Sequence, residues 1–264
     1  MKCLLLAVSF VLAWAFAGAH AEPIVILTTG QSNMAYRIII GSGGERFRWD
    51  PAKNARSWNW NFVDGHIGTA FTPLKDDSIS LADRIASTIA KKRPDQTVYV
   101  INISFSGLSI AHWLPRAPAP DVFANILANV PKALASIGAT RIDFLVWWQG
   151  ENPTGQPTEY PDHFDAVMLR LQAEPWFPRT TPVMIFGVAP SRISKNPDYD
   201  FYNGLLREAA GRSPNRQFFD TGILEEQYWL DAAHPNGMGF WTIGKMAAER
   251  LDGSVPITSV LRER

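Results

Sequence analysis

Ile24-Val-Ile-Leu-Thr-Thr-Gly-Gln-Ser-Asn-Met34 is an apolar run that ends in a short polar turn. The part up to Thr29 is typical of a buried β-strand, and Gly30 allows the backbone to turn sharply at its carboxyl end. Ser32 would then lie at the mouth of the crevice in which open α/β sheets bind their ligands. A serine in such a turn can also serve only as a helix cap, so Ser32 has two interpretations, nucleophile and cap.

Further along the chain, apolar runs of strand length alternate with segments of helical periodicity. Strands are expected at residues 97–103, 142–148, 182–188 and 217–219, and helices at 78–93, 121–137, 159–174, 199–211 and 236–251. Near-continuous apolar strands between helices favour a parallel sheet that is covered on both faces. We therefore expect one α/β domain over residues 22–264, a three-layer α/β/α sandwich around a five-stranded, mostly parallel sheet.

Residues 36–77 form a long stretch in which no regular periodicity is visible, although it contains Trp49, Trp58 and Trp60. Loops of this length inside a compact domain are uncommon and are often functional. The stretch is predicted to fold over the serine's side of the sheet and shape a pocket. The alternative is a surface loop with a small aromatic core of its own.

The first 21 residues have the pattern of a secretory signal peptide. Met1-Lys2 is followed by an apolar run up to Gly18 and then by Ala19-His20-Ala21. The apolar run is shorter than the ~20 residues that a spanning helix needs, which favours cleavage after Ala21 over a membrane anchor. We expect a periplasmic or extracellular protein that is not inserted in the membrane after cleavage. Since Cys3 is the only cysteine, the mature protein would have no disulfide.

The composition argues against several classes of partner. Lys plus Arg and Asp plus Glu both number 25, and removal of Lys2 leaves 24 − 25 = −1. There is no basic excess of the kind that binds nucleic acid. His66, His112 and His163 are scattered with no ligand spacing and the mature chain would have no cysteine, so a structural zinc site is not expected. A mechanism with Ser32 as nucleophile needs no metal or organic cofactor. Ten tryptophans either fill the core or stack on sugar rings.

Polar residues follow three of the predicted strands, at the points where Ser32, Gly107 and Gln149 stand. Because the carboxyl ends of parallel strands lie along one edge of a sheet, these residues should converge in space. The segment Asp231-Ala-Ala-His-Pro235, before the last predicted helix, would bring a histidine to the same edge.

This set of residue types suits acyl transfer. A serine hydroxyl is a weak nucleophile that needs a base, and His234 can supply it while Asp231 holds the imidazole in one tautomer. The alternative for Asp231 and His234 is a solvated turn pair. The oxyanion needs donors, and the candidates are the backbone N–H groups of Ser32 and Gly107 and the side-chain amide of Gln149. Gln149 could instead hydrogen-bond only to backbone at its strand end.

These motifs resemble the SGNH (GDSL-like) hydrolase superfamily, and within it the branch of carbohydrate and sialate O-acetylesterases. The four matching blocks are Gly30–Met34, Ser106–Ile110 with Trp113, Trp148–Glu151, in which a glutamine replaces the superfamily's asparagine, and Asp231–Pro235. The blocks follow one another in the expected order over nearly the whole mature chain. The resemblance implies a flavodoxin-like fold and a serine esterase that removes O-acetyl groups from a carbohydrate through an acetyl-serine intermediate.

The chain departs from the branch at Leu108, where a small or hydroxyl residue is common, and at Asn152-Pro153. Met34 occupies the place of the second glycine of a G-x-S-x-G elbow, which argues against an ordinary α/β-hydrolase.

Three further residues are candidates for substrate binding or support. Asn33 either binds substrate or orients the serine turn, Glu151 is expected to be a buried acceptor that holds loops, and Trp113 is either core or subsite. Two rival functions remain open, an O-acetyltransferase on the same scaffold and an inactive glycan-binding module. The sequence does not identify the acetylated glycan or the oligomeric state.

Overall fold

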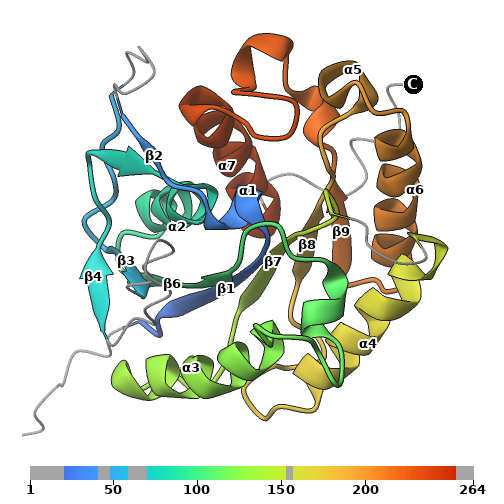
Figure 1. The fold of residues 1–264 in the computed structure, drawn as a ribbon. Helices are drawn as coiled ribbons and strands as arrows, with labels where there is room; N and C mark the ends of the chain where they lie inside the picture. Colours follow the sequence, from blue (N-terminus) through green and yellow to red (C-terminus); the bar gives the residue numbers. More distant parts are fainter. Residues whose placement is uncertain (1–20, 41–47, 59–69, 153–156, 254–264) are drawn as a thin grey trace, which may run out of the picture.

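The computed structural model describes residues 21–40, 48–58, 70–152 and 157–253, and Figure 1 shows their arrangement in three layers. The expected signal peptide lies almost wholly outside the described residues, so cleavage after Ala21 and export stay predictions. None of the described helices has both the length and the apolar character that a membrane crossing requires.

The central sheet has seven strands, in the order β4-β3-β6-β1-β7-β8-β9. Their bounds are β1 Ile24–Gly30, β3 Ala55–Trp58, β4 Phe71–Pro73, β6 Val98–Ser104, β7 Phe144–Trp148, β8 Val183–Phe186 and β9 Arg216–Phe219. All neighbouring pairs are parallel except β3 with β4. The α/β sandwich with a mostly parallel sheet is confirmed, but the expectation of five strands is wrong.

The two additional strands, β3 and β4, come from the stretch at residues 36–77. β3 pairs with β6, with Ala55 beside Val98, and both Ala55 and Trp58 are buried. The two residues between them are polar and half-buried, so the sequence there lacks a recognisable strand pattern. The described part of the stretch therefore extends one edge of the sheet, and the prediction that it folds over the serine is not supported for β3 and β4. Trp60 lies outside the described residues.

β1 is the central strand, and all seven of its residues are buried. It pairs with β6 on one side and β7 on the other, which places Gly30 level with both Ser104 and Trp148. The carboxyl ends of the three strands therefore lie side by side at one edge, as predicted.

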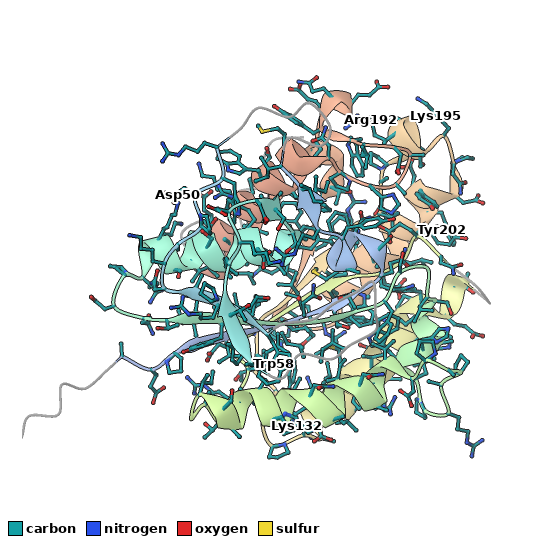
Figure 2. The ribbon with its side chains drawn as sticks, turned by 60° about the vertical axis from the view of Figure 1, so that its left-hand side comes forward. Asp50, Trp58, Lys132, Arg192, Lys195 and Tyr202 are labelled. Atoms are coloured by element: carbon teal, nitrogen blue, oxygen red, sulfur yellow. The ribbon has the colours of Figure 1, made fainter. Side chains whose placement is uncertain are left out.

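Helices cover both faces of the sheet (Figure 1). One face carries α2 (Leu81–Lys92) and α7 (Gly237–Leu251), and the other carries α3 (Val122–Ser136), α4 (Tyr160–Gln172) and α6 (Asp198–Gly211). Successive residues of β1 alternate between the two cores, because strand side chains point to opposite faces: Ile26 packs on the α2 and α7 side and Leu27 on the other. Charged side chains such as Lys132 of α3 lie on the outer surface (Figure 2).

The long helices begin at polar caps that satisfy their first backbone N–H groups. Ser80 accepts from the N–H of Asp83 at the start of α2, Asp121 caps α3, and Asn236 caps α7.

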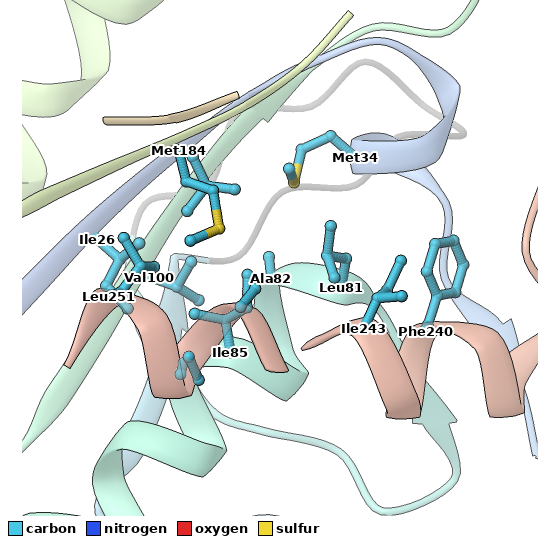
Figure 3. Packing of buried hydrophobic residues seen from close by; sticks show 14 of the residues in the cluster. Ile26, Met34, Leu81, Ala82, Ile85, Val100, Met184, Phe240, Ile243 and Leu251 are labelled. Atoms are coloured by element: carbon cyan, nitrogen blue, oxygen red, sulfur yellow. The ribbon is translucent and has the colours of Figure 1, made fainter. Parts of the chain in front are cut away.

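The remaining elements are short. They are α1 Ser32–Ala35, β2 Ile38–Ile39 paired with β5 Ser78–Ile79, α5 Ser191–Ser194, and the 3-10 helices η1 Ile110–Trp113, η2 Pro157–Glu159, η3 Thr221–Ile223 and η4 Glu226–Tyr228. Met34 anchors the one-turn helix α1 to the core. Its buried side chain points into the hydrophobic cluster formed by α2, α7 and the sheet (Figure 3).

Candidate active site

The turn that carries Ser32 depends on the glycine before it. Gly30 has φ +152°, and a Cβ atom there would lie 2.0 Å from the backbone oxygen of Trp148. That oxygen accepts a hydrogen bond from the backbone N–H of Gln31 at 2.9 Å. Only a glycine allows the backbones of the paired strands β1 and β7 to approach this closely. The turn that follows places Ser32, the first residue of α1, at the carboxyl ends of the strands.

Ser32, His234 and Asp231 form a hydrogen-bonded chain. Ser32 Oγ lies 2.9 Å from His234 Nε2, and His234 Nδ1 lies 2.9 Å from both carboxylate oxygens of Asp231. With the proton on Nδ1, the ring donates to Asp231 and leaves Nε2 free to accept the hydroxyl proton of Ser32. The structure thus brings together the three residues that the sequence places in a catalytic chain.

The His234 loop is shaped by the carboxylate of Asp231. Besides the imidazole, Asp231 Oδ1 accepts the backbone N–H groups of Ala233 at 2.8 Å and His234 at 2.9 Å. Burial by itself would raise the pKa of Asp231, but these hydrogen bonds outweigh it and hold the pKa below its ordinary value. Asp231 therefore stays ionised and keeps the imidazole oriented.

Two backbone N–H groups near the serine are available for an oxyanion. Neither the N–H of Ser32 nor that of Gly107 has an acceptor in the part of the chain that the structure describes. Gly107 is exposed, has φ +74°, and has no atom within 4 Å of where a Cβ would be. Its carbonyl oxygen accepts a hydrogen bond from the side chain of Asn152, so the residue at which the chain departs from the related branch holds the Gly107 loop in place.

Gln149, the third candidate donor, is completely buried. Its Nε2 lies 3.4 Å from both Gln31 Oε1 and the backbone oxygen of Leu108. These distances are beyond the usual range for N–H···O bonds, so the amide is weakly committed to its neighbours. The structure thus contains the backbone contact that was the alternative for Gln149, and its role as an oxyanion donor stays a prediction.

Asn33 links the serine turn to two other segments. The residue is completely buried, and its Nδ2 donates to Glu151 Oε1 at 2.6 Å and to the backbone oxygen of Ala233 at 3.0 Å. Both amide hydrogens of Asn33 are therefore used inside the protein, which favours the interpretation that Asn33 orients the serine turn over direct substrate binding.

Glu151 is half-buried as a residue, while its carboxyl group lies inside the protein and accepts the hydrogen bond from Asn33. Burial raises the pKa of its carboxyl group to about 7, even though hydrogen bonds from Asn33 and others oppose the shift. The Tyr199 hydroxyl donates to the backbone oxygen of Glu151 at 3.0 Å and ties this segment to α6.

Comparison with known proteins identifies the family of this chain. A model of the family described as carbohydrate esterase, sialic acid-specific acetylesterase, matches residues 23–252. The chain belongs to this family. It is therefore a carboxylic ester hydrolase of the SGNH superfamily. A search of curated protein sequences finds no match.

Solved structures with the same fold include NanS, at TM-score 0.65 and 13% identity over 93% of this esterase and 99% of NanS. A protein from Arabidopsis thaliana aligns with TM-score 0.64 and 17% identity over 88% of this chain and 98% of its own. Est24, a carbohydrate acetylesterase from Sinorhizobium meliloti, aligns with TM-score 0.53 and 14% identity over 88% and 100% of the two chains. At these identities the likeness concerns the fold.

Trp113 supports the esterase's active site from inside the core. It is completely buried, and its Nε1 donates to Thr29 Oγ1 at 3.0 Å, which in turn donates to the backbone oxygen of Ile103 at 2.6 Å. Trp113 therefore braces the ends of β1 and β6, which favours the core interpretation over a substrate subsite.

The other tryptophans that the structure describes follow the same pattern. Trp241 is partly buried against the core. The remaining ones are buried: Trp49, Trp58, Trp147, Trp148, Trp176 and Trp229. Core packing, and not stacking on a sugar ring, explains these residues.

Tyr36 is a residue of the site that sequence reasoning missed. Its ring meets the ring of His234 edge-on, with centroids 4.7 Å apart and an interplanar angle of 72°. Tyr36 is placed there by α1, since its backbone N–H donates to the backbone oxygen of Ser32 at 2.7 Å. A single aromatic residue beside a one-turn helix carries no periodic signal that could have singled it out.

The described residues contain no group of three or more His, Cys, Asp or Glu side chains that could hold a metal ion.

Proposed function

We propose that this esterase removes O-acetyl groups from a carbohydrate through an acetyl-Ser32 intermediate. The observation that carries the proposal is the 2.9 Å contact between Ser32 Oγ and His234 Nε2, with Asp231 on the other imidazole nitrogen. This is the arrangement that converts a serine hydroxyl into a nucleophile.

In the first half of the reaction, Ser32 Oγ forms a bond to the acetyl carbonyl carbon while its proton moves to His234 Nε2. Asp231 stabilises the imidazolium that results. The carbonyl oxygen becomes negative, and the backbone N–H groups of Ser32 and Gly107 stabilise it, with the Gln149 amide as a third donor. The bond from the acetyl carbon to the sugar oxygen then breaks, and His234 gives its proton to that oxygen.

In the second half, water replaces the sugar. His234 removes a proton from the water, whose oxygen bonds to the acetyl carbon of the acyl-enzyme. When the bond to Ser32 Oγ breaks, the serine recovers its proton from His234 and acetate leaves.

An acetylated carbohydrate is the substrate class that the family supports, and the family's description names sialic acid. Est24, which shares the fold, is a carbohydrate acetylesterase and points to the same class. The signal-peptide pattern at residues 1–21 supports a periplasmic or secreted enzyme, which would meet such glycans outside the cytoplasm. The intact Ser32–His234–Asp231 chain favours hydrolysis over an inactive glycan-binding module.

A panel of O-acetylated glycans, including sialic acid, xylan, peptidoglycan and exopolysaccharide, tests the proposal. Released acetate and deacetylated products are measured by mass spectrometry with the wild-type protein and with Ser32→Ala. Acetate release that disappears in Ser32→Ala is the expected result. Undiminished release by Ser32→Ala would contradict the serine mechanism, and transfer of the acetyl group to a second glycan in place of water would establish the rival transferase.

A further inference from the structure

Three of the buried polar atoms at the active site that have no hydrogen-bond partner among the described residues lie around the Glu151 carboxyl group. They are Asn33 Oδ1, Glu151 Oε2 and Trp148 Nε1. Buried polar groups nearly always have partners, so an unpaired set at one place requires an explanation. The three atoms belong to one neighbourhood, because Asn33 is bonded to Glu151 and the Trp148 indole interacts with the same carboxyl group.

Asn33 has two amide hydrogens, and the structure uses both. One goes to Glu151 Oε1 at 2.6 Å and the other to the backbone oxygen of Ala233 at 3.0 Å, across 118 and 200 sequence positions. Ala233 immediately precedes His234. The Asn33 amide therefore ties the serine turn, the end of β7 and the histidine loop together, and its orientation sets where the loop lies.

We propose that Glu151 is held as a neutral carboxylic acid whose Oε2–H donates to Asn33 Oδ1, so that Glu151 is a positioning residue for His234. An amide and a carboxylic acid can pair through two hydrogen bonds, N–H···O and O–H···O, and the first of these is present. The same hydroxyl oxygen can accept the indole N–H of Trp148. The proton thus pairs Glu151 Oε2 with Asn33 Oδ1, and a lone pair on the same oxygen is left for the indole N–H.

The surroundings of Glu151 favour the neutral form. No lysine or arginine within the described ranges pairs with its carboxyl group. The titratable groups that face it are His234, Tyr199 and Tyr160. Tyr199 donates to the backbone oxygen of Glu151 and Tyr160 donates to that of Gln149, so neither neutralises a negative charge on the carboxyl. Burial accordingly raises the pKa of Glu151 to about 7, since the charged form is poorly solvated.

An ionised Glu151 would act differently. A carboxylate has no proton to give, so Asn33 Oδ1 would lose its partner, and the amide would keep only two of the three hydrogen bonds that fix its plane. The hydrogen bond to Ala233 would then be less well oriented, and the contact between His234 and Ser32 would loosen. Ionisation of Glu151 would therefore lower the turnover of the enzyme.

Infrared spectroscopy tests the protonation state without relying on activity. The wild-type protein is compared with Glu151→Gln and with the exposed control Glu226→Gln at about one pH unit below and about two units above neutrality, where a typical carboxyl group is ionised. A protonated-carboxyl C=O band is expected at the lower pH in the wild type and in Glu226→Gln but not in Glu151→Gln. Absence of that band in the wild type would mean that Glu151 is an anion and would overturn the proposal.

Kinetics test the positioning role, and only this part rests on the proposed esterase function. Glutamine keeps both a donor and an acceptor towards Asn33, so Glu151→Gln should retain at least about tenfold more kcat than Glu151→Ala on an aryl acetate, with similar KM. Asn33→Ala should resemble Glu151→Ala in kcat, and serves if the latter does not fold. Equal kcat for Glu151→Gln and Glu151→Ala would overturn the positioning role. If the wild type hydrolyses no ester, the proposed function fails while the infrared result still decides the state of Glu151.

Discussion

Ser32 Oγ and His234 Nε2 lie 2.9 Å apart although 202 positions separate them in the chain. Two features of the fold produce this contact. Gly30 turns the chain at the end of the central strand, and the Asp231 carboxylate folds the loop before α7 so that the imidazole faces the serine. The contact joins the first strand of the domain to its last loop, so it can form only when the sheet and α7 are both in place.

Asp231 is expected to control the tautomer of His234. Asp231→Asn keeps the shape of the side chain but cannot hold the Nδ1 proton in the same way, so kcat on an aryl acetate should fall by about 10²–10⁴-fold with little change in KM. Steady-state kinetics against the control Asp95→Asn, an exposed residue, provide the measurement. Full activity of Asp231→Asn would show that the carboxylate is dispensable.

A substitution of Gln149 tests whether its side-chain amide is an oxyanion donor or only a structural contact. Gln149→Met removes the amide while keeping a similar volume in the buried site, and we expect kcat to fall by about 10²-fold because one donor to the oxyanion is lost. Gln172→Met, at the end of α4, is the control for the same substitution away from the site. If Gln149→Met keeps the wild-type kcat and changes only the melting temperature, the amide serves only the backbone contacts at its strand end.

Gly30 is predicted to tolerate no side chain. A Cβ at this position would lie 2.0 Å from the Trp148 backbone oxygen, and backbone atoms of a central strand pair cannot easily move apart. Gly30→Ala should therefore lower the free energy of unfolding by about 3 kcal/mol or more. Gly204→Ala is the control, since Gly204 is an exposed helical residue with open space around it, and it should be neutral or stabilising by up to about 1 kcal/mol. Urea unfolding measures the free energy of unfolding of both variants. Equal effects of the two substitutions would contradict the close approach of Gly30 to the Trp148 backbone.

Glu151 makes a specific contribution to stability as a function of pH. Its pKa is raised from an ordinary value of 4.5 to about 7, so the folded protein keeps a proton that the unfolded chain releases. The contribution to the free energy of unfolding is fully present below about pH 4.5 and is lost as the pH rises to about 7. Since one pKa unit corresponds to about 1.36 kcal/mol, the loss amounts to about 3 kcal/mol. The difference in unfolding free energy between wild type and Glu151→Gln, measured by urea titration across this range, should follow that course. A difference that does not change with pH would mean that the carboxyl ionises alike in both states.

Much of the site could be predicted from local patterns. Gly30, Ser32 and the Asp231–His234 pair each stand next to a strand or loop signal that the sequence displays, and the parallel sheet explains why they meet. Asn33 is different, because its two partners lie 118 and 200 positions away. Nothing in the residues around it could show whether its amide faces substrate or protein, and only the packed structure distinguishes the two.

The number of strands could not be predicted for a related reason. β3 is a four-residue strand in which only the two ends are buried, so its formation depends on pairing with β6 and not on its own pattern. Trp113 shows the opposite problem. Its place in a recognised block suggested a functional position, yet its indole is used inside the core, where Thr29 accepts its N–H.

Mass spectrometry of the enzyme trapped during turnover of an aryl acetate tests the central claim most directly. The protein is mixed with excess substrate, quenched in acid and digested, and the acetyl group is located. We predict an acetyl group on Ser32 in the wild type, and none there in His234→Ala, which lacks the base. Turnover of the ester by a wild-type protein whose Ser32 is never acetylated, or acetylation at another residue that Ser32→Ala leaves unchanged, would contradict the mechanism.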